Sequence, residues 1–245
     1  HIASDAWSQQ ILIAELGRFY LAAVGNGQGN GKVNAALPPL PVQYADYAAW
    51  QRQRLASGGL QSSIDFWRRT LDEGSFQTRL PRDHVPPGKK SFRGAAVPYV
   101  LRPELQQGIR ALCERRGLTV SSVMLSAYAL LVARYTQVAS VSFGIPTAGR
   151  ERLELQDLIG FFVNAVVCRI EVPASGSAAA FMQSVQQTLL QALEHQNVPI
   201  ECLAEIMSRS RTSAEHLDMP MAFNFVEEAE LPAADPAGAQ AALPL

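Results

Sequence analysis

Residues 161–172 read FFVNAVVCRIEV, and this stretch decides the class of fold. An extended chain turns successive side chains to opposite faces of a sheet. One face of this stretch carries four apolar side chains, those of Val166, Cys168, Ile170 and Val172. The opposite face carries Val167, Arg169 and Glu171. The alternation predicts a strand with one face against a core.

The segments on either side of this strand predict helices and a second strand. Residues 141–146, VSFGIP, are strand-like. Residues 119–136, TVSSVMLSAYALLVARYT, are apolar on nearly all sides, which is typical of a helix buried between layers, here under a sheet. A long amphipathic helix follows and ends near residues 195–199, because Pro199 prevents its simple continuation. Its apolar face carries Phe181, Val185, Leu189 and Leu193.

Two further strands are expected nearer the ends of this region, at residues 95–102, AAVPYVLR, and 220–228, PMAFNFVEE. After the first of them a helix begins at Pro103 and is closed by Gly117. The apolar face of that helix carries Leu105, Ile109, Leu112 and Cys113. Residues 95–245 are therefore predicted to form a mixed α/β layer structure, with a flexible Ala/Pro/Gly-rich tail after about residue 228.

Residues 1–80 are predicted to be helical. Ser4 or Asp5 can cap a first helix, which the Gly/Asn-rich residues 25–34 end. A second apolar stripe stops at residues 57–59, SGG, and a third follows it. The stripes carry Tyr44, Tyr47, Ala48 and Leu55, and then Leu60, Ile64, Trp67 and Leu71. No strand stands in front of these helices, so a missing sheet is the simplest explanation, and the Pro-rich and charged residues 81–94 are expected to be a crossing linker.

Composition excludes several classes of protein. The chain has 245 residues, 48% of them apolar and 18% charged, with a formal net charge of −1, which is typical of a globular protein without a nucleic-acid-binding footprint. No apolar stretch is long enough for a membrane span, and no export signal is recognisable. Three separated cysteines, Cys113, Cys168 and Cys202, are expected to be reduced core residues of a cytoplasmic protein. The histidines and cysteines lack metal-ligand spacing, so no metal site is predicted.

Six stretches follow one another in a recognisable order along residues 1 to about 225. They are HIASDAWS (1–8), YADYAAWQ (44–51), LPRDHVPPGKKSFRGA (80–95), IGFFVNAVVCR (159–169), HQNVPIE (195–201) and RTSAEHLDMPMAFNF (211–225). Together they resemble the condensation domains of nonribosomal peptide synthetases. HIASDAWS resembles the downstream part of the family's HHxxxDG signature, with His1 matching the second histidine and Asp5 the aspartate.

The resemblance implies a transferase with two chloramphenicol-acetyltransferase-like lobes, used in the biosynthesis of antibiotics and other secondary metabolites. Residues 1–80 would be the helical remainder of a partial first lobe, and residues 95–245 a truncated second lobe. The chain is accordingly expected to be a fragment with little activity in isolation. Carrier proteins would deliver donor and acceptor thioesters on phosphopantetheine arms, next to an adenylation domain, and the domain itself would bind no cofactor.

The resemblance also implies roles for three residues. His1 would be the catalytic histidine, either as a base toward the acceptor amine or by orienting that amine and stabilising charge. Asp5 would be structural, as a helix cap or as the partner of an arginine, with Arg150 preferred over the nearby Arg152. Ala6 replaces the glycine of the signature, which would add strain of about 1 kcal/mol or more if that position needs a positive φ or a close backbone approach.

Other polar residues give weaker signals. Asn164 and Asn224 are candidates for the lining of the substrate tunnel, with structural hydrogen bonding as the alternative. His195 is interpreted as a helix C-terminal residue rather than a catalyst. The motifs favour the subtype that joins an L-configured donor to an L-configured acceptor, over the epimerisation and heterocyclisation relatives. A non-catalytic, carrier-docking piece of such a synthetase is the alternative function.

Overall fold

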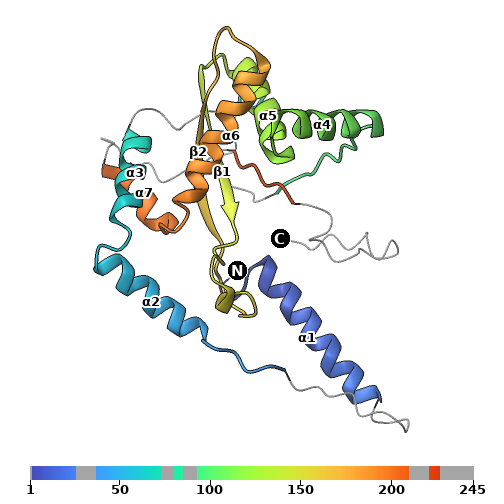
Figure 1. The fold of residues 1–245 in the computed structure, drawn as a ribbon, viewed down its shortest axis with the longest axis vertical. Coiled ribbons are helices and arrows are strands. Elements are labelled where there is room, and N and C mark those ends of the chain that lie inside the picture. Colours follow the sequence, from blue (N-terminus) through green and yellow to red (C-terminus); the bar gives the residue numbers. More distant parts are fainter. Residues whose placement is uncertain (1, 26–36, 73–79, 85–92, 210–220, 227–245) are drawn as a thin grey trace. The chain divides into compact units, whose positions relative to one another are not determined.

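The structure, a computed structural model, describes all residues except 1, 26–36, 73–79, 85–92, 210–220 and 227–245 (Figure 1). The chain divides into two compact units. The first contains α1 (Ala6–Gly25), α2 (Tyr44–Ala56) and most of the segment between the two strands, Thr147–Asn164. The second contains most of α3 (Gln61–Asp72), both strands and the four later helices.

The second unit is built on a two-stranded sheet, β1 (Ser140–Thr147) and β2 (Asn164–Glu171). The N–H of Val172 donates to the carbonyl of Ala139 at 2.7 Å, so the end of β2 lies beside the start of β1 and the strands are antiparallel. These two strands confirm the predictions made from residues 141–146 and 161–172. Val166, Val167, Cys168 and Ile170 are all buried, so side chains from both faces of β2 belong to the core, whereas Val172, just after the strand, is only partly buried. The largest fully buried side chains of this core include Trp67, Leu125, Phe143, Val185 and Leu203.

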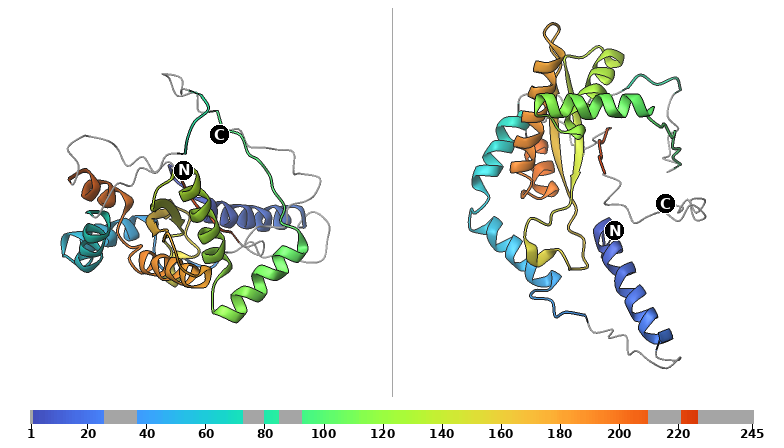
Figure 2. Two further views of the ribbon diagram at one scale, coloured as in Figure 1. Left: turned by 90° about the horizontal axis from the view of Figure 1, so that it is seen from above. Right: turned by 45° about the vertical axis from the view of Figure 1, so that its right-hand side comes forward.

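The helices of this unit follow the apolar periodicity of the sequence. Helix α4 (Pro103–Arg116) begins with proline and ends at Gly117, whose φ of 63° is in the left-handed region that suits glycine. Helix α5 (Val120–Thr136) meets α4 at 109° (Figure 2). The expectation that α5 is buried on nearly all sides is wrong for one side, where Leu130, Leu131 and Tyr135 are exposed.

The last two helices differ in how well the sequence predicted them. Helix α6 (Ala178–Glu194) ends where expected. A further helix, α7 (Ile200–Arg209), was not predicted. The carbonyl of Pro199 accepts hydrogen bonds from the N–H groups of Cys202 and Leu203, so this proline starts a helix instead of only ending one.

The other two predicted strands are not present as strands in the described residues, which leave out residues 220, 227 and 228 of the second one. Residues 95–102 have no regular structure, and the side chains of Val97 and Tyr99 are 92% and 79% exposed. Residues 221–223 form a single parallel bridge, in which Gly144 and Phe223 donate to the carbonyls of Met221 and Gly144. A strand needs a hydrogen-bonded neighbour along its length. The side-chain pattern of either segment does not reveal whether such a neighbour is available.

The three predicted helices of the first part of the chain are confirmed. Helix α2 ends before Gly58, whose φ is 76°. In the first unit, Tyr47 of α2 and the preceding Val42 pack against a small cluster of Leu155, Leu158 and Phe162. A short 3-10 helix, Leu153–Leu155, lies in the same segment. Most of the expected linker at 81–94 and the tail after 228 lie outside the described residues, and the division into domains at 81–94 stays a prediction.

The cysteines are reduced in the structure. Cys113 and Cys168 are buried, Cys202 is partly buried, and all three are free thiols. Burial raises the pKa of Cys168 to about 12, so it stays protonated at neutral pH.

Over the part of the chain that the structure describes, no single helix has the length and apolar character of a membrane span. The bent pair of α4 and α5 meets the criteria of length and composition only when the two helices are taken together.

Candidate functional site

The start of α1 is fixed by the side chain of Asp5. Its Oδ1 accepts the N–H of Ser8 at 2.8 Å, and its carbonyl accepts the N–H of Gln9 at 3.0 Å, which makes Asp5 the N-cap of α1. Its Oδ2 accepts the N–H of Phe162 at 2.9 Å. One carboxylate therefore caps a helix and holds a backbone segment more than 150 positions away in the chain.

Arg150 joins the same carboxylate from the segment that follows β1. Its Nη2 lies 3.3 Å from Asp5 Oδ1 and donates to Ser8 Oγ at 2.8 Å, and the two charged side chains are only 1% and 6% exposed. Its Nη1 donates to two carbonyls of the same segment, those of Leu155 and Leu158. The guanidinium also lies over the ring of Phe162, with Cζ 4.1 Å from its centroid. Arg150 thus organises its own loop around the ion pair.

Two positions near this pair have special backbone requirements. Gly149 has a φ of 64°, and a Cβ there would lie 2.0 Å from the carbonyl oxygen of Phe162. Glycine is required at this close approach. Ala6, by contrast, is the first residue of α1 and is exposed, and Gln137 is the single described non-glycine residue with a positive φ. The strain that a positive φ at Ala6 would cause is therefore not present.

Asp5 stays ionised to low pH. Burial acts to raise its pKa, but the N–H groups of Ser8 and Phe162 and the charge of Arg150 together lower it below its usual value. A carboxylate whose acceptor positions are filled in this way holds its neighbours in place. It is poorly suited to accept a proton from a substrate, so Asp5 is a structural candidate rather than a base.

The lowered pKa predicts how stability depends on pH. A depressed folded-state pKa adds stability that is complete above the unfolded value of about 3.9 and is lost as pH falls through the folded pKa. The free energy of unfolding of the chain, measured by urea titration from pH 6 to the lowest pH at which it folds, should therefore fall on the acid side. Asp5→Asn should flatten this acid-side loss, whereas Asp157→Asn, which changes an exposed carboxylate of the same segment, should not. An unchanged acid-side slope in Asp5→Asn would contradict the prediction.

The other predicted site residues lie in different surroundings. His1 is outside the described residues. Asn164 is the first residue of β2 and is partly buried, while Asn224 is exposed. His195 is the C-cap of α6, as interpreted; its Nδ1 lies 3.0 Å from Ser63 Oγ and its carbonyl accepts from the indole of Trp67. Within the described ranges, no group of three or more His, Cys, Asp or Glu side chains could hold a metal ion.

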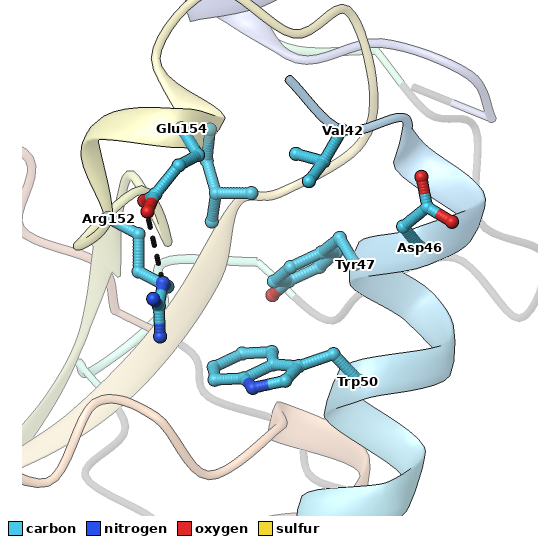
Figure 3. A pocket seen from close by; sticks show the side chains of 7 residues that line it. Val42, Asp46, Tyr47, Trp50, Arg152 and Glu154 are labelled. Carbon is cyan, nitrogen blue, oxygen red and sulfur yellow. Dashed lines mark ion pairs between the residues drawn. The ribbon is translucent and has the colours of Figure 1, made fainter.

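A separate cavity of about 260 Å³ opens between α2 and the 3-10 helix (Figure 3). The indole of Trp50 and the ring of Tyr47 point toward Arg152 and Glu154, whose charged groups are 3.5 Å apart. Arg152 is 57% exposed and lies over Trp50, so it belongs to this cavity. The remaining lining residues are Val42, Asp46 and Leu155.

Sequence reasoning missed Ser8 and Gly160. Ser8 is fully buried, and its hydroxyl bonds both the N–H and the carbonyl of Gly160. Ser8 follows Asp5 by three positions, where a helix cap bonds an N–H, but serine there gives no sign of a long-range partner. A glycine directly before an apolar strand, as in residues 159–164, was the available signal of a close backbone approach.

Comparisons with known proteins point to one family. The family model described as "Condensation domain" matches residues 1–240. Malpibaldin synthetase of Mortierella alpina is 36% identical over 211 residues, which are 86% of this chain and 4% of that protein. Enniatin synthetase of Fusarium oxysporum is 35% identical over 201 residues, which are 82% of this chain and 6% of that protein. The chain therefore spans a small part of these relatives.

Solved structures share the fold. The X-domain from teicoplanin biosynthesis matches with a TM-score of 0.73 and 27% identity, over 84% of this chain and 46% of that one. The first condensation domain of the CDA synthetase matches with a TM-score of 0.62 and 20% identity, over 84% of this chain and 44% of that one. These matches confirm the predicted fold class, and the chain spans less than half of either structure.

Proposed function

The chain belongs to the condensation-domain family, and we propose that within a nonribosomal peptide synthetase it forms a peptide bond between two carrier-bound substrates. The observation that carries this proposal is the family match over residues 1–240, together with 36% identity to malpibaldin synthetase. The donor is an acyl or peptidyl thioester, the acceptor an aminoacyl thioester. Each is tethered to the phosphopantetheine arm of a carrier domain, with an adenylation domain adjacent and the assembly in the cytoplasm.

The reaction needs a group that takes up a proton, and a histidine can supply it. The acceptor amine attacks the donor carbonyl, the C–N bond forms, the C–S bond breaks, and the donor carrier leaves as a thiol. An α-amino group with a pKa near 8 is mostly protonated at pH 7, so a group must take up a proton. The imidazole of His1 serves as that base, or orients the amine and stabilises the charge that develops.

The ion pair of Asp5 and Arg150 supports a structural role beside His1. Three residues separate His1 from Asp5 along the chain, and the pair fixes the start of α1, the helix that follows both of them. Asn164, partly buried at the start of β2, and Asn224 are proposed to line the substrate tunnel. The substrates are proposed to be an L-configured donor and an L-configured acceptor.

A second function has one observation in its favour. A related structure at a TM-score of 0.73 and 27% identity is described as a complex of the X-domain and OxyB from teicoplanin biosynthesis, so a fold of this kind binds a partner protein there. This chain could in the same way act as a docking piece without catalysis.

Incubation with separately loaded donor and acceptor carrier proteins distinguishes the two functions. We expect the synthetase that carries this chain to form dipeptidyl thioester on the acceptor carrier, detected by intact-protein mass spectrometry. The 245-residue chain alone is expected to form little or none. Carrier binding without product in the complete synthetase would favour the docking function and reject the catalytic one.

A further inference from the structure

Ser8 lies at the centre of the contacts between the start of α1 and the segment before β2. It is 0% exposed. Its hydroxyl donates to the carbonyl of Gly160 at 2.7 Å and accepts from the N–H of Gly160 at 3.0 Å and from Arg150 Nη2 at 2.8 Å. One donated and two accepted bonds exhaust the capacity of a hydroxyl group. The orientation of this hydroxyl is therefore fixed by its three partners.

The residues that Ser8 holds lead directly into β2. A Cβ at position 160 would lie 2.2 Å from Tyr44 Cδ2, so the chain passes this point only as glycine. The hydroxyl of Tyr44 donates to the carbonyl of Phe161 at 2.9 Å, and the N–H of Phe162 is bound by Asp5. Side chains thus hold three consecutive residues, and β2 begins two residues later at Asn164.

Ser8 also binds both members of the ion pair. Its N–H donates to Asp5 Oδ1, and Arg150 Nη2 lies closer to its hydroxyl, at 2.8 Å, than to Asp5 Oδ1, at 3.3 Å. In the described residues, the Ser8 hydroxyl links Arg150 to Gly160, because it accepts one hydrogen bond from Arg150 Nη2 and another from the N–H of Gly160. Removing it would leave Nη2 with its longer contact and Gly160 with two buried unpaired groups.

We infer that Ser8 is a positioning residue for the proposed peptide-forming reaction. Its hydroxyl holds the Asp5–Arg150 pair and the Gly160 backbone in one arrangement, and so sets where the start of α1, which follows His1 in the sequence, lies relative to Asn164. The inference rests on the proposed function. Displacements of about 1 Å at a reacting group cost roughly 10²-fold in rate, so a loss of this hydroxyl should be visible in catalysis.

The test is Ser8→Ala in the complete synthetase, with Trp7→Phe as the matched control. Trp7 is the neighbouring residue and donates its indole N–H to the carbonyl of Gln156 at 2.9 Å, so Trp7→Phe also removes one bond to the same segment. Ser8→Ala should lower kcat about 10- to 100-fold. The KM for the acceptor thioester should change little, and Trp7→Phe should keep both values. A wild-type kcat in folded Ser8→Ala would overturn the inference.

Two further measurements keep the inference testable. If Ser8→Ala does not fold, Ser8→Cys takes its place in the test. Cysteine nearly preserves the volume of serine and hydrogen-bonds weakly, so Ser8→Cys should give an intermediate kcat. A wild-type kcat in Ser8→Cys would count against the inference. Hydrogen exchange followed by mass spectrometry should show faster exchange at residues 160–162 in Ser8→Ala than in Trp7→Phe. If the wild-type synthetase forms no peptide, the proposed function fails and the positioning role fails with it, whereas the exchange result separately tests the contact itself.

Discussion

Replacing Arg150 by alanine is expected to destabilise the chain by about 3–5 kcal/mol, because removal of one partner leaves the other charge buried and unpaired. Asp5 would keep its cap bonds but would lose the guanidinium that compensates its charge, and the carbonyls of Leu155 and Leu158 would lose the hydrogen bonds that Arg150 donates. Lysine cannot replace Arg150, because one ammonium group cannot bond at the same time the groups that Nη1 and Nη2 reach separately. Urea unfolding of Arg150→Ala and Arg150→Lys at pH 7 measures both effects.

The chain offers a close control in Arg152. It is an arginine of the same segment, also paired with a carboxylate and also over an aromatic ring, but it is 57% exposed. Exposed ion pairs contribute about 0–1 kcal/mol, so Arg152→Ala should be nearly neutral. Equal losses of stability in Arg150→Ala and Arg152→Ala would show that burial does not increase the contribution of the Asp5–Arg150 pair to the free energy of unfolding.

The sequence predicted those parts of the fold that depend on local periodicity. The stripe of Ile64, Trp67 and Leu71 needs only the helical repeat and a core to face, and α3 has both. Residues 95–102 have an equally clear local pattern but no regular structure, because a strand depends on a second chain segment. Helix α7 was not predicted because Pro199 was interpreted only as the end of the preceding helix. Proline also suits the start of a helix, and Pro199 lies directly before α7.

The candidate site shows the same division. The cap of α1 is local, and residue type alone limited it to Ser4 or Asp5, of which the structure shows Asp5 to be the cap. The choice of Arg150 over Arg152 came from the family resemblance, since neither spacing nor composition distinguishes two arginines separated by one residue. Ser8 and Gly160 are 152 positions apart, and no sequence period relates them. Their contact depends on the tertiary structure of the first unit, and the local patterns of a single sequence do not show which distant residues meet there.

Replacing His1 by alanine in the complete synthetase is expected to lower the rate of dipeptidyl thioester formation by about 10²–10⁴-fold, the range typical of a lost general base. His84→Ala is the control, because His84 is an exposed histidine outside regular structure and should keep the wild-type rate. Single-turnover mass spectrometry with preloaded carriers measures the chemical step without the loading steps. A His1→Ala variant with the wild-type rate would remove His1 from the mechanism.

The pH dependence then separates the two roles proposed for His1. A base must be neutral to act, so the rate should rise with pH through an apparent pKa near 6.5, the usual value for imidazole. His1→Gln can still hydrogen-bond the amine but cannot titrate near this pH. If His1 is the base, His1→Gln should be as slow as His1→Ala and should lose that inflection. If orientation and charge stabilisation dominate, His1→Gln should retain part of the rate, because an activated thioester needs its attacking amine held in place more than it needs a proton acceptor.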